Sequence, residues 1–223
     1  MTGRAATSET PRRLARADRE EQILGIAHRQ FATRGFGAVT MEEIAAEAGV
    51  TKPLLYAYFG NKDRLYEACM EPAGEALVEA VIAAVAGAGD ATDALASGVR
   101  AFFAFVDSDR DAWRVLFDET LPAGGAMAQR AAAYRERIAG LLSDTIGQTL
   151  TNEQRGHPQT AAVVEALSVS LMAAAEQLAR WFLRTGALSA GQAADLLIAT
   201  VAPGLARVAA NPPSNQTHKD STR

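Results

Sequence analysis

Apolar side chains recur every three to four residues along almost the whole chain, and the period-two alternation that marks β-strands is nearly absent. This pattern predicts an all-α protein. Capping residues, glycines and prolines divide the chain into about nine helices. Their expected ranges are 18–35, 41–48, 52–58, 62–86, 92–107, 111–119, 126–150, 159–185 and 190–209, with loops over 121–125 and 151–158. Pro72 and Gly74 are expected to interrupt or kink the fourth helix, leaving a separate piece over 75–86, and Pro203 and Gly204 to kink the last.

The segment from 40 to 62 reads T-MEEIAAEAGV-TKPLLYAYF-GNK and predicts two short helices joined by a tight turn. Thr40 and Glu43 have the spacing of a capping box. Gly49 stands where a helix commonly ends in a left-handed residue, and Thr51 is suited to cap the next helix. Two short helices joined by a turn containing glycine are the helix-turn-helix pattern, whose second helix enters the DNA major groove.

Three stretches of this part of the chain resemble one protein family. They are Phe31-Ala32-x-x-Gly35, then Val39-Thr40-x-x-x-Ile44-Ala45-x-x-Ala48-Gly49-Val50-Thr51, then Leu55-Tyr56-x-Tyr58-Phe59-x-Asn61-Lys62-Asp63-x-Leu65. Over about residues 18–66 the chain resembles the TetR/AcrR family of bacterial transcriptional regulators. The remainder agrees in length, helix number and helix order. The resemblance implies a homodimeric repressor whose C-terminal domain binds a small molecule.

The chain is expected to have four parts. They are a flexible basic arm (1–17), a three-helix DNA-binding domain (18–66, with its motif at 40–59), a helical effector-binding and dimerisation domain (67–210) and a disordered polar tail (211–223). Residues 1–62 carry nine Lys or Arg against seven Asp or Glu, whereas residues 63–223 carry thirteen against nineteen. A mildly basic front joined to an acidic body suits a protein that touches phosphate at one end only.

Helical geometry at 100° per residue places Leu55 and Phe59 in the core and leaves an outward arc for the DNA groove. This arc comprises Lys52, Pro53, Leu54, Tyr56, Ala57 and Tyr58. Most of it offers apolar contact, and Lys52 alone is able to read guanine. We therefore expect modest direct readout, with operator shape contributing.

The resemblance implies a division of roles among these positions. Backbone phosphates would be contacted by Thr40, Tyr56, Tyr58 and Lys62, and the bases would lie nearest Thr51, Lys52, Pro53 and Ala57. Glu42 departs from the family, because some relatives place a base-reading residue there. Its carboxylate would either accept a hydrogen bond from cytosine or repel phosphate and stay clear.

Aromatic and polar residues of the acidic body are candidates for an effector pocket. They are Phe102, Phe103, Phe105, Trp113, Phe117, Met127, Tyr134, Met172 and Glu176. Most aromatics at helical spacing are ordinary core. Glu176 has three interpretations: an anchor for a cationic ligand, a partner for Arg180, or a solvent-facing residue. The apolar helices over 163–182 and 196–208 either pair across a two-fold axis as a four-helix bundle or pack within one subunit, and we favour the dimer.

Other functions find little support. No nucleophile–base pair, phosphate-binding glycine loop or metal-ligand spacing occurs, so we expect no enzyme, cofactor or metal site. Asp107, Asp109 and Asp111 resemble the start of a calcium loop, but Ala112 replaces the required glycine, so we expect capping aspartates. Cys69 is expected to be a small buried residue. A helical protein-interaction module that no longer binds DNA remains the alternative.

The expected location is the bacterial cytoplasm. The single cysteine excludes a disulfide framework. The N-terminus has arginines but no apolar core, so it does not resemble a signal peptide. No run reaches the roughly 18 apolar residues of a membrane span, so we expect no membrane partner. The expected partners are double-stranded DNA, a second copy of the chain and a small-molecule effector.

Overall fold

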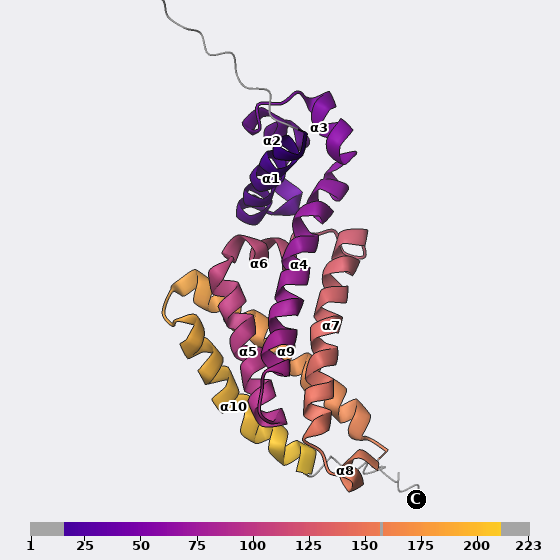
Figure 1. The fold of residues 1–223 in the computed structure, drawn as a ribbon, viewed down its shortest axis with the longest axis vertical. Helices are drawn as coiled ribbons and strands as arrows, with labels where there is room; N and C mark the ends of the chain where they lie inside the picture. The colour runs from indigo at the N-terminus through magenta and orange to yellow at the C-terminus, as the bar shows by residue number, and fades with distance from the viewer. Residues whose placement is uncertain (1–15, 157, 211–223) are drawn as a thin grey trace, which may run out of the picture.

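The computed structural model describes residues 16–156 and 158–210, and every regular element in these ranges is a helix. The helices are α1 (Arg16–Ala38), α2 (Met41–Glu47), α3 (Lys52–Phe59), α4 (Lys62–Ala86), α5 (Ala91–Ser108), α6 (Arg110–Leu116), α7 (Ala126–Gln148), α8 (Asn152–Gly156), α9 (Thr160–Thr185) and α10 (Ala190–Ala210). The predicted all-α class is confirmed. Helices α1–α3 form a headpiece at one end of an elongated molecule, and α4 leads from it into a body formed by α5–α10 (Figure 1).

The headpiece contributes to one apolar core that continues into the body. Its members include Ile23 and Phe31 of α1, Ile44 of α2, and Leu55 and Phe59 of α3, and all five are buried. Leu55 and Phe59 therefore face inward as predicted. Burying side chains of this size contributes about 1.5–3 kcal/mol each relative to exposure, so the outer surface of α3 is held on a well-anchored helix.

Helix α4 runs unbroken from Lys62 to Ala86 with Pro72 inside it, so the predicted separate helix over 75–86 is wrong. Gly74 does not interrupt the helix, and its lack of a side chain is needed for packing. A Cβ atom built there lies 2.4 Å from Cζ of Tyr134 on α7, so only glycine lets the tyrosine ring lie against the α4 backbone. The Tyr134 hydroxyl in turn lies 3.5 Å from the Glu71 carbonyl oxygen. The connection between headpiece and body is therefore one helix.

The second loop predicted in the body is partly helical. Thr151 and Gln154 form a reciprocal pair: the Thr151 hydroxyl accepts from the Gln154 N–H at 3.2 Å, and the Gln154 side chain accepts from the Thr151 N–H at 2.8 Å. This capping box begins α8 and adds the tenth helix. Asp109 caps α6 by accepting from the Ala112 N–H at 2.9 Å, which confirms the predicted capping role of this aspartate.

The start of α1, the course of α10 and the two chain ends also bear on the predicted boundaries. Helix α1 begins at Arg16, two residues before its predicted start, while Gly35 breaks its helical geometry with a φ of 76°. Helix α10 continues through Pro203, and the kink expected there stays a prediction. The arm up to residue 15 and the tail over 211–223 lie outside the described residues.

Helix α9 corrects the expectation about membrane-spanning segments. It is long and apolar enough by composition to cross a membrane, with a mean hydropathy of 1.4 over its 18-residue window. It packs instead against α7 and α10. Only 28 % of that window is buried within the chain, so much of an apolar helix is left uncovered.

Candidate nucleic-acid interface

Helix α3 presents a continuous outer surface. Thr51 caps it by accepting from the Leu54 N–H at 3.4 Å, and Pro53 occupies its first turn. The exposed residues are Thr51, Lys52, Pro53, Leu54, Tyr56 and Ala57. Leu54 is 42 % exposed and Tyr56 39 %, so both side chains are accessible to a partner. The predicted outward arc is therefore solvent-accessible, apart from the half-buried Tyr58.

Glu42 and Lys52 form an ion pair between α2 and α3. Hydrogen bonding to Lys52 lowers the pKa of Glu42, and the same bond raises the pKa of Lys52. The Lys52 ammonium also lies 5.8 Å from the centre of the Tyr56 ring. The only cation on the outer surface of α3 is therefore held by a neighbouring carboxylate, an arrangement that neither interpretation of Glu42 anticipated.

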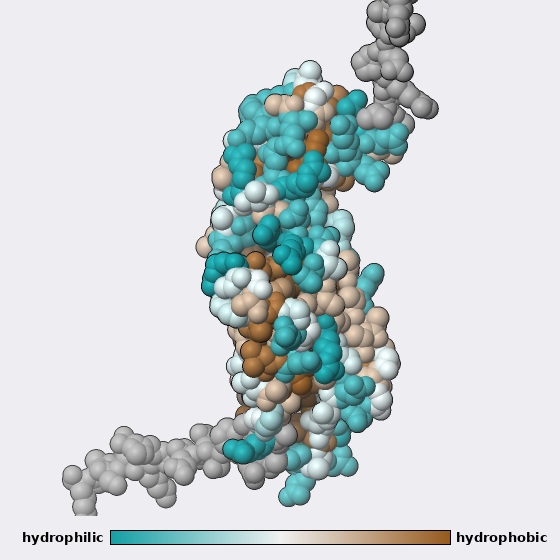
Figure 2. Space-filling model, turned by 90° about the vertical axis from the view of Figure 1, so that its left-hand side faces the viewer, coloured by the Kyte–Doolittle hydropathy of each residue, from teal (hydrophilic) through white to brown (hydrophobic). Residues whose placement is uncertain are grey.

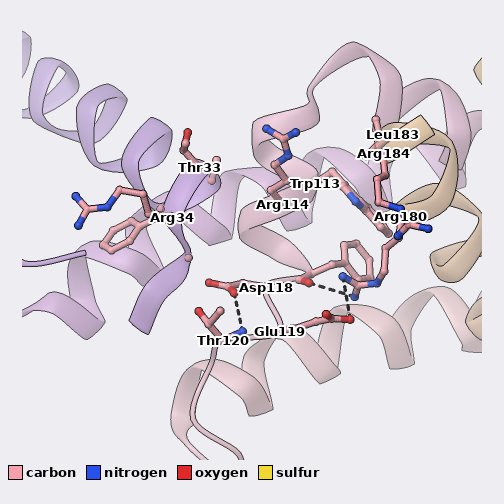
Figure 3. Close-up of a pocket in the computed structure, with 14 residues that line it drawn as sticks. Thr33, Arg34, Trp113, Arg114, Asp118, Glu119, Thr120, Arg180, Leu183 and Arg184 are labelled. Atoms are coloured by element: carbon pink, nitrogen blue, oxygen red, sulfur yellow. Dashed lines mark hydrogen bonds and ion pairs between the residues drawn. The ribbon is translucent and has the colours of Figure 1, made fainter. Parts of the chain in front are cut away.

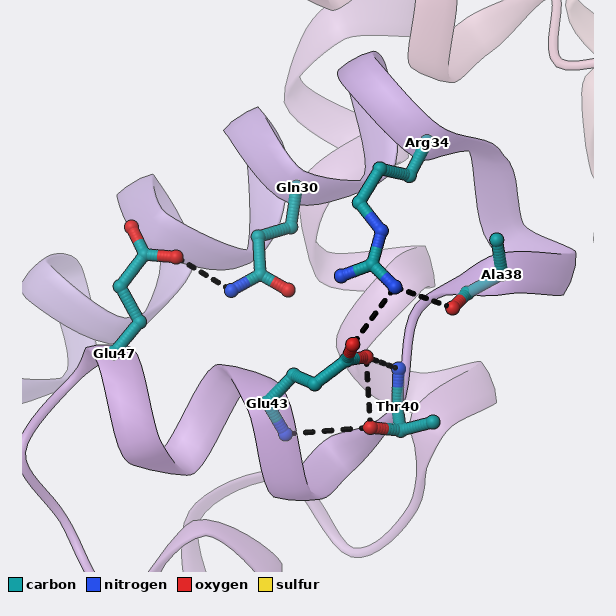
Figure 4. Close-up of polar contacts among 6 residues, drawn as sticks. All are labelled: Gln30, Arg34, Ala38, Thr40, Glu43 and Glu47. Atoms are coloured by element: carbon teal, nitrogen blue, oxygen red, sulfur yellow. Dashed lines mark hydrogen bonds and ion pairs between the residues drawn. The ribbon is translucent and has the colours of Figure 1, made fainter.

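Thr40 and Glu43 form the predicted capping box at the start of α2 (Figure 4). The Glu43 N–H donates to the Thr40 hydroxyl at 3.3 Å, and Glu43 Oε2 accepts from the Thr40 N–H at 2.9 Å. Arg34 binds the other oxygen of Glu43 at 2.8 Å. Because the Thr40 hydroxyl also donates to Glu43 at 2.8 Å, its proton is engaged within the headpiece.

Tyr58 and Lys62 lie beside this surface and are half-buried. The Arg16 guanidinium lies 5.4 Å from the centre of the Tyr58 ring. The Lys62 ammonium lies 4.3 Å from the centre of the Phe36 ring, and burial lowers its pKa. Both side chains therefore have packing roles, and both keep part of their surface in solvent.

The body contains a small apolar cavity, and two larger cavities are open to solvent. The apolar one, about 20 Å³, is lined by residues that include Phe102 and Met172. A cavity of about 570 Å³ between headpiece and body includes Trp113 and Phe117 in its walls, and one of about 370 Å³ beside α1 and α4 includes Phe105. The predicted effector residues are thus divided among three places.

The remaining candidates line none of these three cavities. Phe103 is fully buried, and Met127 and Tyr134 are core residues. The side chain of Glu176 is only 12 % exposed, and its Oε1 binds Arg135 Nε at 2.9 Å. Its Oε2 lies 3.9 Å from Arg180, so of the three interpretations the partnership with Arg180 fits, with Arg135 as the stronger partner.

Cys69 is buried on α4, as predicted. Its Sγ lies 3.8 Å from the Leu24 carbonyl oxygen, and burial raises the thiol pKa to about 12. A thiol with this pKa stays protonated at neutral pH and is a poor nucleophile. Among the described residues, no group of three or more His, Cys, Asp and Glu is arranged to hold a metal ion.

The loop after α6 binds the end of α1, and sequence reasoning missed this contact. Asp118 Oδ2 accepts the Phe36 N–H at 2.6 Å, and the Thr120 hydroxyl accepts the Gly37 N–H at 3.2 Å. A Cβ at Gly35 lies 2.7 Å from the Thr120 hydroxyl oxygen, so the close approach requires glycine. The partners are 82 and 83 residues apart in sequence, and no local pattern signals such a contact.

Comparisons with known proteins agree with this geometry. The family model described as "Bacterial regulatory proteins, tetR family" matches residues 23–69, and "Tetracyclin repressor-like, C-terminal domain" matches residues 91–204. The HTH-type transcriptional activator FasR of Mycolicibacterium smegmatis is 32 % identical over 157 residues, which is 70 % of this chain and 72 % of FasR.

Solved structures show the same architecture. A TetR-like transcriptional regulator from Rhodococcus sp. RHA1 superposes with a TM-score of 0.72 at 31 % identity, covering 87 % of this chain and 99 % of that one. AibR, solved in complex with isovaleryl coenzyme A and operator DNA, has a TM-score of 0.68 at 22 % identity, covering 83 % and 98 %. The relatives are regulators and not enzymes. The chain therefore belongs to the TetR family of transcriptional regulators, with a helix-turn-helix DNA-binding domain in its headpiece.

Proposed function

We propose that this regulator is a homodimeric repressor of the bacterial cytoplasm that leaves a palindromic operator when a small molecule binds its body. The observation that carries the proposal is the outer surface of α3. It is exposed over Lys52, Pro53, Leu54, Tyr56 and Ala57, while Leu55 and Phe59 anchor the helix beneath. An exposed short helix of this kind fits the major groove, which is about 12 Å wide.

The proposed dimer interface lies on α9 and α10. Val169 is 57 % exposed, Trp181 37 % and Leu196 51 %, and each is a large apolar side chain. Figure 2, which views the side along which α10 runs, shows apolar surface gathered over the body and mostly polar surface over the headpiece. A two-fold pairing of α9 and α10 would cover such side chains as a four-helix bundle. Two headpieces are needed to read half-sites about 34–36 Å apart.

We assign the DNA contacts as the family pattern suggests. Tyr56, Tyr58 and Lys62 would contact phosphates, as would Thr40 once its hydroxyl turns from Glu43. The bases would lie nearest Thr51, Lys52, Pro53, Leu54 and Ala57, and Glu42 would tune the cation of Lys52. Apolar groups dominate this surface, so thymine methyl groups are the contacts it favours.

The effector would act through the connection between body and headpiece. Residues 67–210 are proposed as the effector-binding and dimerisation domain, and α4 as the helix that transmits the change. A ligand shifts the equilibrium between two headpiece separations only by its difference in affinity for them. AibR is a regulator of the same fold that binds both a small molecule and its operator, and this supports a two-site arrangement.

Activation is a second candidate role, because FasR, the relative 32 % identical to this chain, is named as an activator. A reporter gene placed behind the upstream region of the regulator's own gene separates the two roles. Higher expression on deletion of the regulator supports repression, whereas lower expression supports activation.

Gel-shift titration against that upstream region tests DNA binding itself. Tyr56→Phe and Lys62→Ala should each weaken binding about five- to tenfold, because each removes a phosphate contact. Arg137→Ala is the matched control, since Arg137 pairs with Glu75 between α7 and α4, away from both the headpiece and the proposed dimer helices. Unchanged affinity in both headpiece variants would contradict the assignment. Affinity that is independent of salt would favour the protein-interaction module, because phosphate contacts release counterions.

A further inference from the structure

A cavity of about 570 Å³ lies between the headpiece and the body. Its walls come from the end of α1, from α6 and the loop after it, and from the last turns of α9 (Figure 3). This volume lies within the range of small-molecule sites, roughly 300–1,000 Å³. The cavity also lies at the opposite end of α1 from Arg16, which approaches Tyr58 of α3. Its position therefore suits a ligand other than operator DNA.

The cavity is rich in arginine. Arg34, Arg114, Arg180 and Arg184 line it, against the carboxylates of Asp118 and Glu119, which gives four positive charges against two negative. Figure 3 shows Arg180 and Arg184 beside each other on the body side and Arg114 apart from them, whereas Arg34 extends away and binds Glu43. Arg114 and Arg180 also meet carboxylates, so Arg184, which makes no ion pair among the described residues, is the cation most available to an anion.

Two of these arginines have spare hydrogen-bonding capacity. Arg184 makes no ion pair among the described residues, and Arg114 meets only Asp111, at 3.5 Å. Arg180 binds Glu119 at 3.2 Å and the Phe117 carbonyl oxygen at 3.2 Å. Its Nε is nevertheless buried without an acceptor. Leaving a buried donor unpaired costs about 1–3 kcal/mol, so an acceptor supplied by a ligand would be stabilising.

The same cavity also has an apolar side. The rings of Trp113 and Phe117 stack with centroids 3.9 Å apart, but each side chain is only 2 % exposed, so the half-buried Leu183 offers the apolar contact. A small inorganic anion would leave Leu183 without a contact. A compact organic molecule uses both features, because its apolar part packs on Leu183 and its charged group meets the guanidinium groups.

We propose that the junction cavity binds a compact organic anion, with a carboxylate, sulfonate or phosphate group held by Arg114, Arg180 and Arg184 and an apolar part packed on Leu183. Thr33 and Gly35 of the headpiece line the other side. The bound anion therefore touches both parts of the molecule, next to the hydrogen bond from Phe36 to Asp118. Its effect on operator binding rests on the proposed regulatory function, whereas its binding does not.

A pair of fluorescent probes tests the charge requirement on the full-length protein. 8-Anilinonaphthalene-1-sulfonate and N-phenyl-1-naphthylamine share one ring system, and only the first carries a sulfonate. The sulfonate probe should bind one site per chain, and Arg184→Gln and Arg114→Gln should each weaken it about tenfold, as expected for loss of a charged hydrogen bond. The neutral probe should bind more weakly and be unaffected by these variants. Arg100→Gln is the control, because Arg100 is a surface arginine paired with Asp195. This variant should change the binding of neither probe.

A second variant tests the place of binding without changing charge. Thr33→Trp fills the headpiece wall and should weaken the sulfonate probe, while circular dichroism and thermal unfolding confirm the fold. Equal binding of the two probes, or wild-type binding by all three cavity variants, would overturn the proposal. Displacement of the probe by inorganic phosphate at similar concentration would overturn the organic-anion class. Gel shifts with the same variants report DNA binding separately, so that failure of the regulatory function is distinguishable from failure of the site.

Discussion

Asp118 accepts the backbone N–H of Phe36 at 2.6 Å, and this hydrogen bond joins the body to the headpiece. The same carboxylate holds its own loop in shape, because Oδ1 accepts the Thr120 N–H at 2.7 Å. The Tyr66 hydroxyl lies 3.3 Å from Oδ2 while donating to the Val115 carbonyl oxygen. One half-buried side chain thus fixes the end of α1 relative to α4 and α6, and the orientation of the headpiece depends on it.

Asp118→Ala should destabilise the protein by about 1–3 kcal/mol, because it removes a charged acceptor from backbone donors. Urea unfolding followed by circular dichroism measures the change. Asp107→Ala is the control: Asp107 makes an exposed ion pair with Arg110, worth at most about 1 kcal/mol. Operator affinity should change in the first variant and not in the second. A variant at Asp118 with wild-type stability and affinity would show that the contact does not couple the two parts.

Because Glu42 pairs with Lys52, removal of the Glu42 carboxylate should increase the affinity for DNA. Glu42→Gln frees Lys52 and removes a negative charge from the proposed interface. Binding should tighten several-fold at low salt, with a salt slope steeper by about one unit. Lys52→Gln should weaken binding. Fluorescence anisotropy at several salt concentrations measures both, and a Glu42→Gln protein that binds DNA less tightly would indicate that Glu42 reads a base.

Gly74→Ala should cost about 1–3 kcal/mol, because the new methyl group collides with the Tyr134 ring. Gly140→Ala on α7 is a matched control: a Cβ there meets nothing within 4 Å, so the change should stabilise the helix by up to about 1 kcal/mol. Thermal unfolding compares the two. In the double variant Gly74→Ala/Tyr134→Ala the cost should be less than the sum of the single costs, and simple additivity would argue against the collision.

We expect Glu43 to make the stability of the fold depend on pH in the acid range. Hydrogen bonds from Arg34 and then from Thr40 lower its pKa from 4.5 to about 2. Since the folded-state pKa is the lower one, the carboxylate stabilises the fold above about pH 4.5, and this contribution is lost as pH falls toward 2.

The advantage of the wild type over Glu43→Gln in urea unfolding should therefore shrink as pH falls through this window. Glu79→Gln is the control, because Glu79 is exposed on α4 and makes no ion pair among the described residues. A wild-type advantage that stays constant from pH 6 to pH 3 would contradict the assigned pKa.

Local patterns predicted the headpiece because its structure depends on local interactions. The capping box of Thr40 and Glu43, the left-handed Gly49 and the cap at Thr51 act within three or four residues. The same reasoning was available for Thr151 and Gln154, where a capping box begins α8. At Pro72 and Gly74 it failed, because the contact that explains Gly74 comes from Tyr134, 60 residues away.

The effector candidates illustrate the same limit. Phe105 is half-buried and lines a cavity, but Phe103 and Met127 are core residues, and helical spacing does not distinguish the two cases. The sequence did not predict Arg180 and Arg184 as site residues. They line a cavity only because α6 and the end of α1 lie beside α9. Contacts between distant segments decide which residues share a cavity.

Photocrosslinking from α3 tests the central claim most directly. A photoreactive p-benzoylphenylalanine at Ala57, on the outer surface of α3, should crosslink to a duplex from the upstream region. The same group at Ala133, exposed on α7, should not. Crosslinking from position 57 alone, abolished by excess unlabelled operator, is the predicted result. A protein that shifts the duplex yet crosslinks only from position 133 would contradict the account.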